Sequence, residues 1–553
     1  QVWGIQLRRS VRRKNEWAYL TPVPQSLAGP QALNRVSAGG TLVGLDLPPA
    51  GLNLELKPYV VSRVTTDRVV SPPVSNDFGL EIGGDAKYSI TPNLTADLTV
   101  NTDFAQVEID EQQVNLTRFS LFFPEKRDFF LEGRGVFEFA RGGIGAGPDA
   151  GATDTPYLFY SRRIGLNQGR IVPIEVGGRV TGKAGPWAIG LMNIQTGDES
   201  VSQTEPTNFT VVRLKRDVLR RSAIGVMATN RSVSTVGPGS NQAYGIDGSF
   251  GLSQDVNVGV YWARTNTTGL SGDDQSYEGR FDYNADRYGA RVEHLSVGAN
   301  FNPEVGFTRR TDFNRSVAQL RFSPRPAGIP SVRKFTWSGS GEYIENGAGV
   351  VEGRVWQGHF GTEFESSDEF SLDVKRTYEL LHEPFTPSGS PVPIAAGGYT
   401  YSDVEASYEF GAHRWASGEI SVRAGEYYDG SIRSVTIGQG RMALHPQLSI
   451  DPSLTLTRIK LPAATFTTRL VRTRVDFSFT PLMFASALVQ YNSADRAFST
   501  NLRFRWEYAP GSELFLVYTD ERDTTDEGLA TPGTVRGLKN RAFVVKLNRL
   551  LRF

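Results

Sequence analysis

The sequence contains no cysteine, and this absence excludes several kinds of chemistry. Without thiols there is no disulfide, no cysteine nucleophile and no thiolate ligand for a metal. Histidine is scarce as well, and no two of the five histidines have the i, i+4 spacing of a helical zinc site. They are His294, His359, His382, His413 and His445. These absences argue against a cysteine hydrolase and a zinc protease.

Long hydrophobic runs and net charge are missing too. No run of about 18 apolar residues occurs, which excludes transmembrane helices. The 59 basic and 59 acidic residues cancel, so overall charge gives no indication of nucleic-acid binding. Neither a phosphate-binding glycine loop nor a G-x-S-x-G nucleophile motif is present. We therefore expect no catalytic residues, no cofactor and no metal, and we interpret Asp149, Asp154, Asp273 and Asp274 as loop carboxylates.

Apolar and polar residues alternate from about Leu52 to the end of the chain. In one segment Leu502, Phe504, Trp506 and Tyr508 interleave with Arg503, Arg505 and Glu507. Successive side chains of a strand point to opposite faces, so such a segment has one apolar and one charged face. Charged residues facing a dry sandwich core are costly unless paired, whereas a wide water-filled lumen removes that cost.

The connections between these segments are of two kinds, tight turns such as 480–482 and longer polar loops such as 382–397. Short turns at one rim and long loops at the other are typical of bacterial outer-membrane barrels. The chain has 553 residues and lacks the 40–50-residue repeat that would indicate a soluble propeller. We predict an all-β fold, a large antiparallel transmembrane barrel of 24–26 strands with 26 preferred, in the outer membrane of a Gram-negative bacterium.

The last segment, 540–553, has the form of a closing barrel strand. Lys546, Asn548 and Arg552 fall between its apolar residues, and the chain stops on an aromatic residue. Such a terminal strand resembles the insertion signal that the barrel assembly machinery reads. The candidate signal residues are Phe543, Val545, Leu547, Leu551 and Phe553.

Three regions are predicted along the chain. Residues 1–24 form a basic β segment, a remnant or joint of an upstream domain, and residues 25–51 form a glycine- and proline-rich linker. Residues 52–553 form the transmembrane barrel. The basic residues Arg8, Arg9, Arg12, Arg13 and Lys14 of the first region are solvated or dock a partner protein.

Residues 104–139 break the alternation, because charged and aromatic residues crowd together there. Lipid does not accept such a run of charges, and irregular backbone at membrane depth must be buried in protein or line water. We predict that this segment folds into the lumen as a constriction, the alternative being an ordered loop at one rim. Its candidate residues are Glu108, Asp110, Arg118, Phe119, Phe122, Phe123, Glu125, Lys126, Arg127 and Asp128. Glu108, Asp110 and Glu111 are expected to pair with Arg118 or Arg127.

The run from Phe104 to Glu132, with QVNLTRFSLFFPEKRDFFLE at its centre, resembles the signature of domain-of-unknown-function family 5916. FNPEVGFTRR at 301–310 and GEYYDG at 425–430 are similar to turns of that family, and WGIQLRRSVRRKNEWAYLTPVP resembles its joint to an upstream module. The resemblance implies an outer-membrane barrel, usually preceded by a domain similar to carbohydrate-binding module family 9. That module, expected before Gln1, is not in this sequence.

These patterns favour a channel or transporter-like barrel with a polar, partly occluded lumen that passes or binds a solute or polymer, for example a carbohydrate. Its basic lumen wall would be Arg472, Arg474, Arg503 and Arg505. The alternative is a non-conducting barrel that anchors a periplasmic or surface protein. The expected partners are outer-membrane lipid and lipopolysaccharide, the barrel assembly machinery and such a protein, with no nucleic acid.

Overall fold

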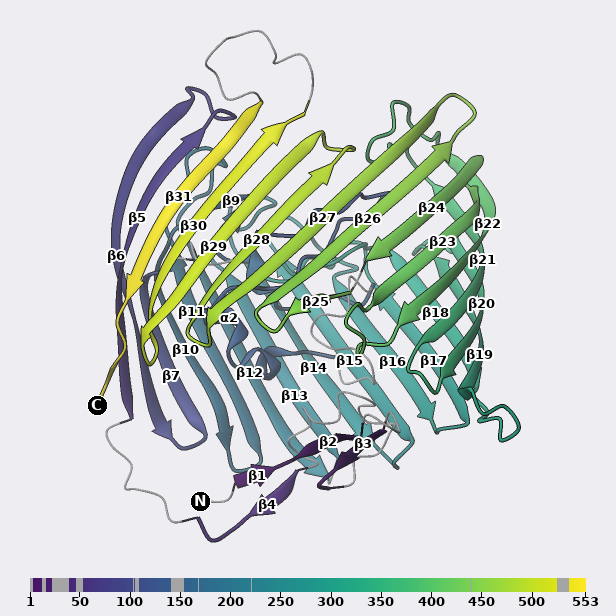
Figure 1. Cartoon of the computed structure of the whole chain (residues 1–553), viewed down its shortest axis with the longest axis horizontal. Coiled ribbons are helices and arrows are strands. Elements are labelled where there is room, and N and C mark those ends of the chain that lie inside the picture. Colours follow the sequence, from purple (N-terminus) through teal and green to yellow (C-terminus); the bar gives the residue numbers. More distant parts are fainter. Residues whose placement is uncertain are drawn as a thin grey trace.

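Alternating residues build a continuous antiparallel wall in the computed structural model of this chain (Figure 1). The structure describes residues 3–11, 16–21, 39–45, 53–102, 104, 109–140, 154–167, 169–219, 221–438, 440–524 and 537–553. None of its helices within these ranges is long and apolar enough to cross a membrane. The predicted all-β barrel is confirmed.

The wall begins with three strands and resumes after a long excursion. The first three are β5 (Leu54–Asp67), β6 (Val74–Thr91) and β7 (Leu94–Thr102). The next ten are β10 (Ile174–Ala184), β11 (Trp187–Thr196), β12 (Thr207–Leu219), β13 (Ser222–Arg231), β14 (Asn241–Gly251), β15 (Val256–Thr267), β16 (Gln275–Asn284), β17 (Tyr288–Val297), β18 (Phe313–Phe322) and β19 (Val332–Glu345). The remainder are β20 (Val351–Phe364), β21 (Glu369–Leu381), β22 (Gly397–Phe410), β23 (Gly418–Tyr427), β24 (Gly430–Gly438), β25 (Met442–His445), β26 (Leu448–Lys460), β27 (Thr465–Thr480), β28 (Met483–Asn492), β29 (Ala497–Ala509), β30 (Ser512–Asp523), β31 (Leu538–Asn548) and β32 (Leu551–Arg552).

The described part of the wall has 24 strands, the lower end of the predicted range. The closed sheet contains 26 segments, but β25 continues β24 along β26, and β32 continues β31 along β5. The preferred number of 26 is therefore two strands too high. Closure comes from the pairing of β31 and β32 with β5, which joins the end of the chain to the first wall strand.

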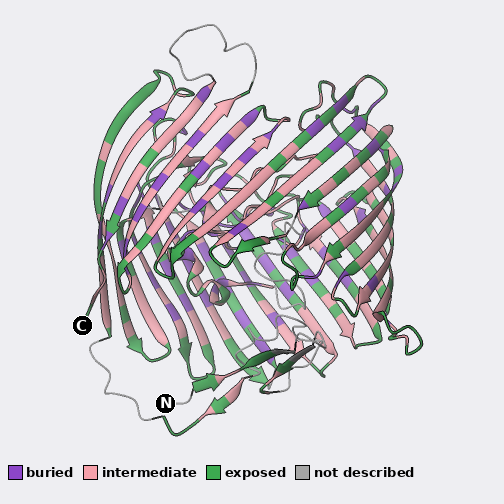
Figure 2. Cartoon of the chain, in the orientation of Figure 1, coloured by how far each residue is buried: buried purple, intermediate pink, exposed green. Residues whose placement is uncertain are grey.

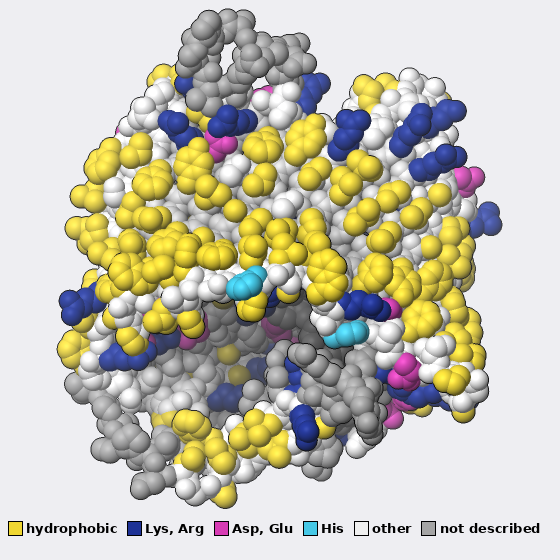
Figure 3. All heavy atoms as spheres, in the orientation of Figure 1, with side chains coloured by type: hydrophobic (Ala, Val, Ile, Leu, Met, Phe, Trp, Pro, Cys, Tyr) yellow, Lys and Arg dark blue, Asp and Glu magenta, His cyan; other side chains and the backbone are white. Residues whose placement is uncertain are grey.

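Each strand exposes one face outward and turns the other inward (Figure 2). Along β6, for example, Phe78, Leu80 and Ile82 are exposed, and the outward apolar side chains of many strands form a broad yellow band around the middle of the wall (Figure 3). Dark blue lysine and arginine side chains gather beyond the edges of that band. Such a belt is the surface that the hydrocarbon of a bilayer accepts.

The two rims differ as the loop lengths predict. Tight turns such as that between β27 and β28 gather at one rim, the lower one in Figure 1, which we call the tight-turn rim. The opposite rim carries most of the longer connections, including 382–396 between β21 and β22, and is called the long-loop rim. The C-terminus lies on the tight-turn side.

Two small sheets precede the wall and lie beside the tight-turn rim in Figure 1. One pairs β1 (Trp3–Ile5) with β4 (Gly40–Leu42), and the other pairs β2 (Arg8–Val11) with β3 (Glu16–Tyr19). Arg8 and Arg9 of the predicted basic segment lie on β2, whereas Arg12, Arg13, Lys14 and most of the predicted linker lie outside the described residues.

The excursion between β7 and β10, residues 103–173, is called the plug. Its described elements are α2 (Asp128–Leu131), η3 (Arg134–Phe137), η4 (Ser161–Arg163), β8 (Leu166–Asn167) and β9 (Arg170–Ile171). Because the plug leaves the wall at the long-loop rim and contacts inward side chains of many strands, it lies within the barrel as predicted. The barrel is therefore occluded by a segment inserted after its third strand.

Candidate functional site

The plug fills one side of the lumen through apolar contacts. Phe130, Phe137, Phe139, Leu158 and Ile164 of the plug form one buried cluster with inward residues of β10 to β19. Wall residues of this cluster include Ile174, Met192, Ile194, Phe209, Val211, Met227 and Leu295. The inner face of these strands also carries charged groups: Arg179 of β10 donates to the carbonyl oxygen of Glu132 of the plug at 2.5 Å, and Arg213 of β12 pairs with Asp247 of β14. The plug therefore meets a lumen wall that is apolar at this cluster and charged around it.

Two wall glycines allow the plug to approach the backbone. A Cβ atom at Gly190 would lie 2.8 Å from Phe137, and one at Gly245 would lie 2.7 Å from Phe139. A side chain at either position would require the ring to move, so these glycines fix how deeply the plug sits.

A buried ion pair holds the centre of the plug. Arg127 donates from Nε to Glu125 at 2.8 Å and to the carbonyl oxygens of Ile164 at 2.6 Å and Ser161 at 2.8 Å. The Ser161 hydroxyl donates to Glu125 at 2.6 Å. Burial raises the pKa of the Glu125 carboxyl, but these hydrogen bonds and the charge of Arg127 outweigh it, so the pKa lies below its usual value. Glu125 and Arg127, two of the predicted constriction residues, therefore stabilise the fold of the plug itself.

Aromatic candidates of the constriction divide between the plug interior and the open lumen. Phe122 packs against Tyr157, Tyr160 and Phe307 with ring centroids 4.8 to 5.5 Å apart. Phe119 and Phe123 instead line lumen cavities. Only the latter two are placed to contact a solute.

Residues 109–119 of the plug, here called the strap, contact the opposite wall through polar groups. Glu111 pairs with Arg472 and with Arg474, the latter at 3.2 Å. The backbone N–H of Gln112 donates to Gln490 at 2.8 Å. Arg118 pairs with Glu379 of β21 at 2.9 Å. The strap is therefore held to the wall by hydrogen bonds and ion pairs, in contrast to the apolar side of the plug.

The ion-pair partners expected for Asp110 and Glu111 are wrong. Asp110 pairs with Arg162 and, at 3.7 Å, with Lys126, while Glu111 reaches the basic wall. Arg118 and Arg127 have the partners described above, and Glu108 lies outside the described residues. Sequence proximity suggested pairs inside the run 108–127, but the fold brings wall residues and η4 closer.

Two of the cavities between the plug and the wall have no lining residue in common. The long-loop cavity, of about 750 Å³, reaches Glu342 and Ile344 near the long-loop end of β19. The tight-turn cavity, of about 700 Å³, reaches Phe484 and Phe515 near the tight-turn ends of β28 and β30. The plug thus divides the polar part of the lumen in two.

The tight-turn cavity contains most of the predicted basic wall. Arg474, Arg503 and Arg505 line it together with Asp110, Lys126 and Asp128 of the plug. Arg505 is paired with Glu513. Arg472 and Arg474 share the single carboxylate of Glu111, and Arg505 has that of Glu513, so the positive charge of this wall is partly balanced by acidic groups.

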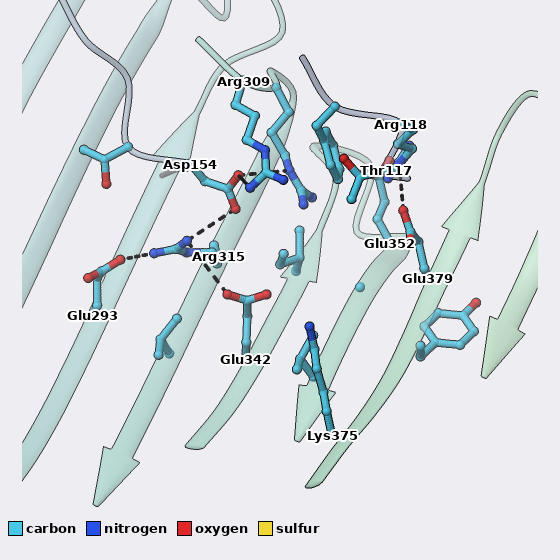
Figure 4. Close-up of a pocket in the computed structure, with 18 of the residues that line it drawn as sticks. Thr117, Arg118, Asp154, Glu293, Arg309, Arg315, Glu342, Glu352, Lys375 and Glu379 are labelled. Carbon is cyan, nitrogen blue, oxygen red and sulfur yellow. Dashed lines mark hydrogen bonds and ion pairs between the residues drawn. The ribbon is translucent and has the colours of Figure 1, made fainter. Parts of the chain in front are cut away.

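The long-loop cavity contains residues that the sequence patterns did not identify as a site (Figure 4). The guanidinium groups of Arg309 and Arg310 lie 4.5 and 4.6 Å from the ring centroid of Phe119. Arg315 lies between Glu293, Asp154 and Glu342. The adjacent arginines at the end of FNPEVGFTRR were the sequence feature that could have indicated this site. Their loop has no alternation of apolar and polar residues, so the sequence does not show that these side chains point into the lumen.

Other candidates have ordinary roles. His359 contacts Asp373 at 3.0 Å on the inner wall, and Asp274 pairs with Arg264. Asp154 is buried among arginines, and Asp149 lies outside the described residues. Within the described ranges no group of three His, Asp or Glu side chains is placed to hold a metal ion.

The terminal strand places Phe543 and Leu547 on the outward face and leaves Phe553 56% exposed. Val545 and Leu551 are partly exposed. This arrangement exposes the terminal aromatic residue at the surface of the barrel.

Residues 48–173 match a domain of unknown function (DUF5916), the family that the sequence resembles. The match covers the first three wall strands and the plug up to β10. The comparison with curated proteins found no match.

Among solved structures, the chain is similar to a mutant of the ferric enterobactin receptor PfeA from Pseudomonas aeruginosa, with 9% identity, a TM-score of 0.39 and coverage of 93% of this chain and 82% of that chain. The ferric yersiniabactin uptake receptor FyuA from Yersinia pestis has 9% identity and a TM-score of 0.40, with coverage of 97% of this chain and 87% of that chain. OpdQ from Pseudomonas aeruginosa has 7% identity and a TM-score of 0.27, with coverage of 90% of this chain and 96% of that chain. All three similarities are low, so the fold assignment is based on the closed sheet itself.

Proposed function

We propose that this chain, in which DUF5916 covers the plug and the strands that lead into it, is a transporter-like barrel of the bacterial outer membrane. It binds solutes in its lumen and passes them between the plug and the wall. The observation that carries the proposal is the divided lumen: polar cavities lie on both sides of a plug that packs on one wall through buried apolar side chains and is held to the opposite wall by the polar contacts of the strap.

The outward face supports a membrane location. A continuous apolar band would be costly in water, whereas hydrocarbon accepts it, and the charged side chains beyond the band suit the two interfaces (Figure 3). Lipopolysaccharide, outer-membrane lipid and the barrel assembly machinery are the partners that this surface and the terminal strand suit.

The polar attachment of the strap supports passage past the plug. Its charged contacts lie in cavities that water can enter, where ion pairs exchange with water at little net cost. Separating the buried apolar side of the plug from the wall would have no such compensation, because its aromatic side chains would become exposed to water. Movement of the strap is therefore expected to open a path next to β20–β30 while the apolar side stays in place.

Liposome swelling in an isotonic pentose tests this proposal, with E111Q as the variant and R325Q as the control. Arg325 pairs with Asp286 outside both cavities. Removing the charge of Glu111 weakens its contacts with Arg472 and Arg474 by about 1–3 kcal/mol, which shifts the strap equilibrium by about tenfold. We expect faster swelling for E111Q than for the wild type and R325Q.

Failure of both the wild type and E111Q to admit the pentose would contradict passage. That result would favour the non-conducting barrel that anchors another protein.

A further inference from the structure

Arg309 and Arg310 are two cations with unused hydrogen-bond donors in the long-loop cavity. Both belong to the 298–312 connection, and neither side chain donates a hydrogen bond to any residue that the structure describes. A guanidinium whose terminal N–H groups have no acceptor in the chain is suited to an acceptor that enters the cavity.

The nearest described carboxylate of the chain does not accept a hydrogen bond from Arg309 or Arg310. Asp154 lies 3.7 Å from Arg309 and 3.6 Å from Arg310, beyond ordinary hydrogen-bond length, and it accepts instead from Arg315 at 3.3 Å. One carboxylate is therefore shared by three arginines. The surplus positive charge is local to Arg309 and Arg310, because Arg315 also pairs with Glu293.

A third cation extends into the same cavity from the wall. Lys375 of β21 points into the cavity in Figure 4 and has no ion-pair or hydrogen-bond partner among the residues that the structure describes. By contrast, Arg118 and Arg423, which also line the cavity, are paired with Glu379 and Asp403.

Phe119 holds the two guanidinium groups in place. Stacking of both groups on one ring fixes their planes and leaves their N–H edges free to donate. Guanidinium edges fit the paired oxygen atoms of a carboxylate or phosphate, often with two parallel hydrogen bonds.

The cavity has room for more than an inorganic ion. Its volume of about 750 Å³ lies within the range of pockets for small organic ligands. Four tyrosines line it, and the hydroxyls of Tyr401, Tyr427 and Tyr428 already donate to Glu379 or to the carbonyl oxygen of Leu116. Their rings are therefore the part that a bound solute meets.

We infer that Arg309, Arg310 and Lys375 bind the carboxylate or phosphate group of an organic solute in the long-loop cavity. This inference names the class of solute for the proposed function. It rests on the proposed function for the route by which the solute leaves the cavity. Three stretches that carry the family resemblance supply the cavity: Phe119 comes from 104–132, the arginines from 301–310, and Tyr427 and Tyr428 from 425–430.

Isothermal titration of the detergent-solubilised full chain tests the inference, with citrate and inorganic phosphate as probes and sodium chloride at equal ionic strength as reference. The variants are R309Q/R310Q and, because Lys375 has no partner whose loss would disturb folding, K375Q. R325Q is the matched control. Loss of charge-assisted hydrogen bonds is expected to weaken citrate binding about tenfold or more in R309Q/R310Q and about threefold or more in K375Q.

Citrate binding that is weakened by R309Q/R310Q and K375Q but kept by R325Q supports the inference. Absence of citrate binding to the wild type, or equal binding by wild type and K375Q, overturns it. Pentose swelling measured on the same preparation separates the two proposals: a protein that swells liposomes without binding citrate contradicts only the inference, whereas one that binds citrate without swelling contradicts only passage.

Discussion

At the scale of single residues, the plug depends on charges that find partners across the fold. The Glu125–Arg127 pair is buried and is supported by hydrogen bonds with Ser161 and with two backbone carbonyls. Such a network fixes one arrangement of the chain, whereas removing one member leaves a buried charge unpaired.

Replacing Arg127 with methionine is expected to destabilise the plug by about 3–5 kcal/mol, because Glu125 would keep its charge without a partner. The measurement is the urea concentration at which the plug becomes sensitive to protease in the detergent-folded barrel. The double variant E125Q/R127M removes both charges and is expected to recover part of the loss. Equal resistance of R127M and the wild type would show that the pair does not hold the plug.

The same carboxylate predicts a pH dependence. Because the pKa of Glu125 in the folded plug lies below its usual value of 4.5, its contribution to stability is present above that value and is lost as the pH falls through the folded pKa. Protease resistance of the plug is therefore expected to be constant near neutral pH and to decline only in acid. The E125Q variant should lack this acid-dependent component.

At the scale of elements, the end of the chain closes the wall. Strands β31 and β32 pair with β5, so the barrel cannot close until the last residues have been added. The predicted assembly signal lies on this same pair of strands, with Phe553 exposed beside the apolar band.

Replacing Phe553 with alanine is expected to reduce the fraction of folded barrel in the outer membrane, because the terminal aromatic residue is part of the proposed signal. Heat-modifiable mobility on gels measures that fraction. F479A is the matched control, since Phe479 is an exposed aromatic residue near the tight-turn end of β27. An equal reduction in both variants would indicate a general need for aromatic residues at the membrane surface.

At the scale of the whole molecule, the membrane assignment depends on which face of the wall meets lipid. Val374 and Lys375 are neighbours on β21, yet Val374 is 50% exposed on the outer surface and Lys375 lines the long-loop cavity. Because the chain has no cysteine, a cysteine at either position is unique.

In liposomes, the variant K375C is expected to react with a water-soluble maleimide about tenfold or more faster than V374C, since lipid excludes the reagent and disfavours the thiolate. Both should react equally in urea. Fast reaction of V374C in liposomes would mean that the apolar band faces water, and it would contradict the membrane assignment.

The sequence by itself determined the wall. Apolar and polar side chains must alternate in a strand with lipid on one side and water on the other, so Phe78, Leu80 and Ile82 reveal their face without knowledge of their neighbours. The exact number of strands was less certain, because the lengths of the connections gave a range of 24–26 and the closed sheet has 24.

Only the tertiary structure decided what lies inside the wall. The plug has no period, and its partners are far away in sequence: Glu111 meets Arg472, and Phe119 meets Arg309 and Arg310. The apolar residues on the inner face of β10 to β19 are likewise explained only by the plug that covers them. Such contacts depend on how the chain closes in space, so no local pattern of residues could have identified them.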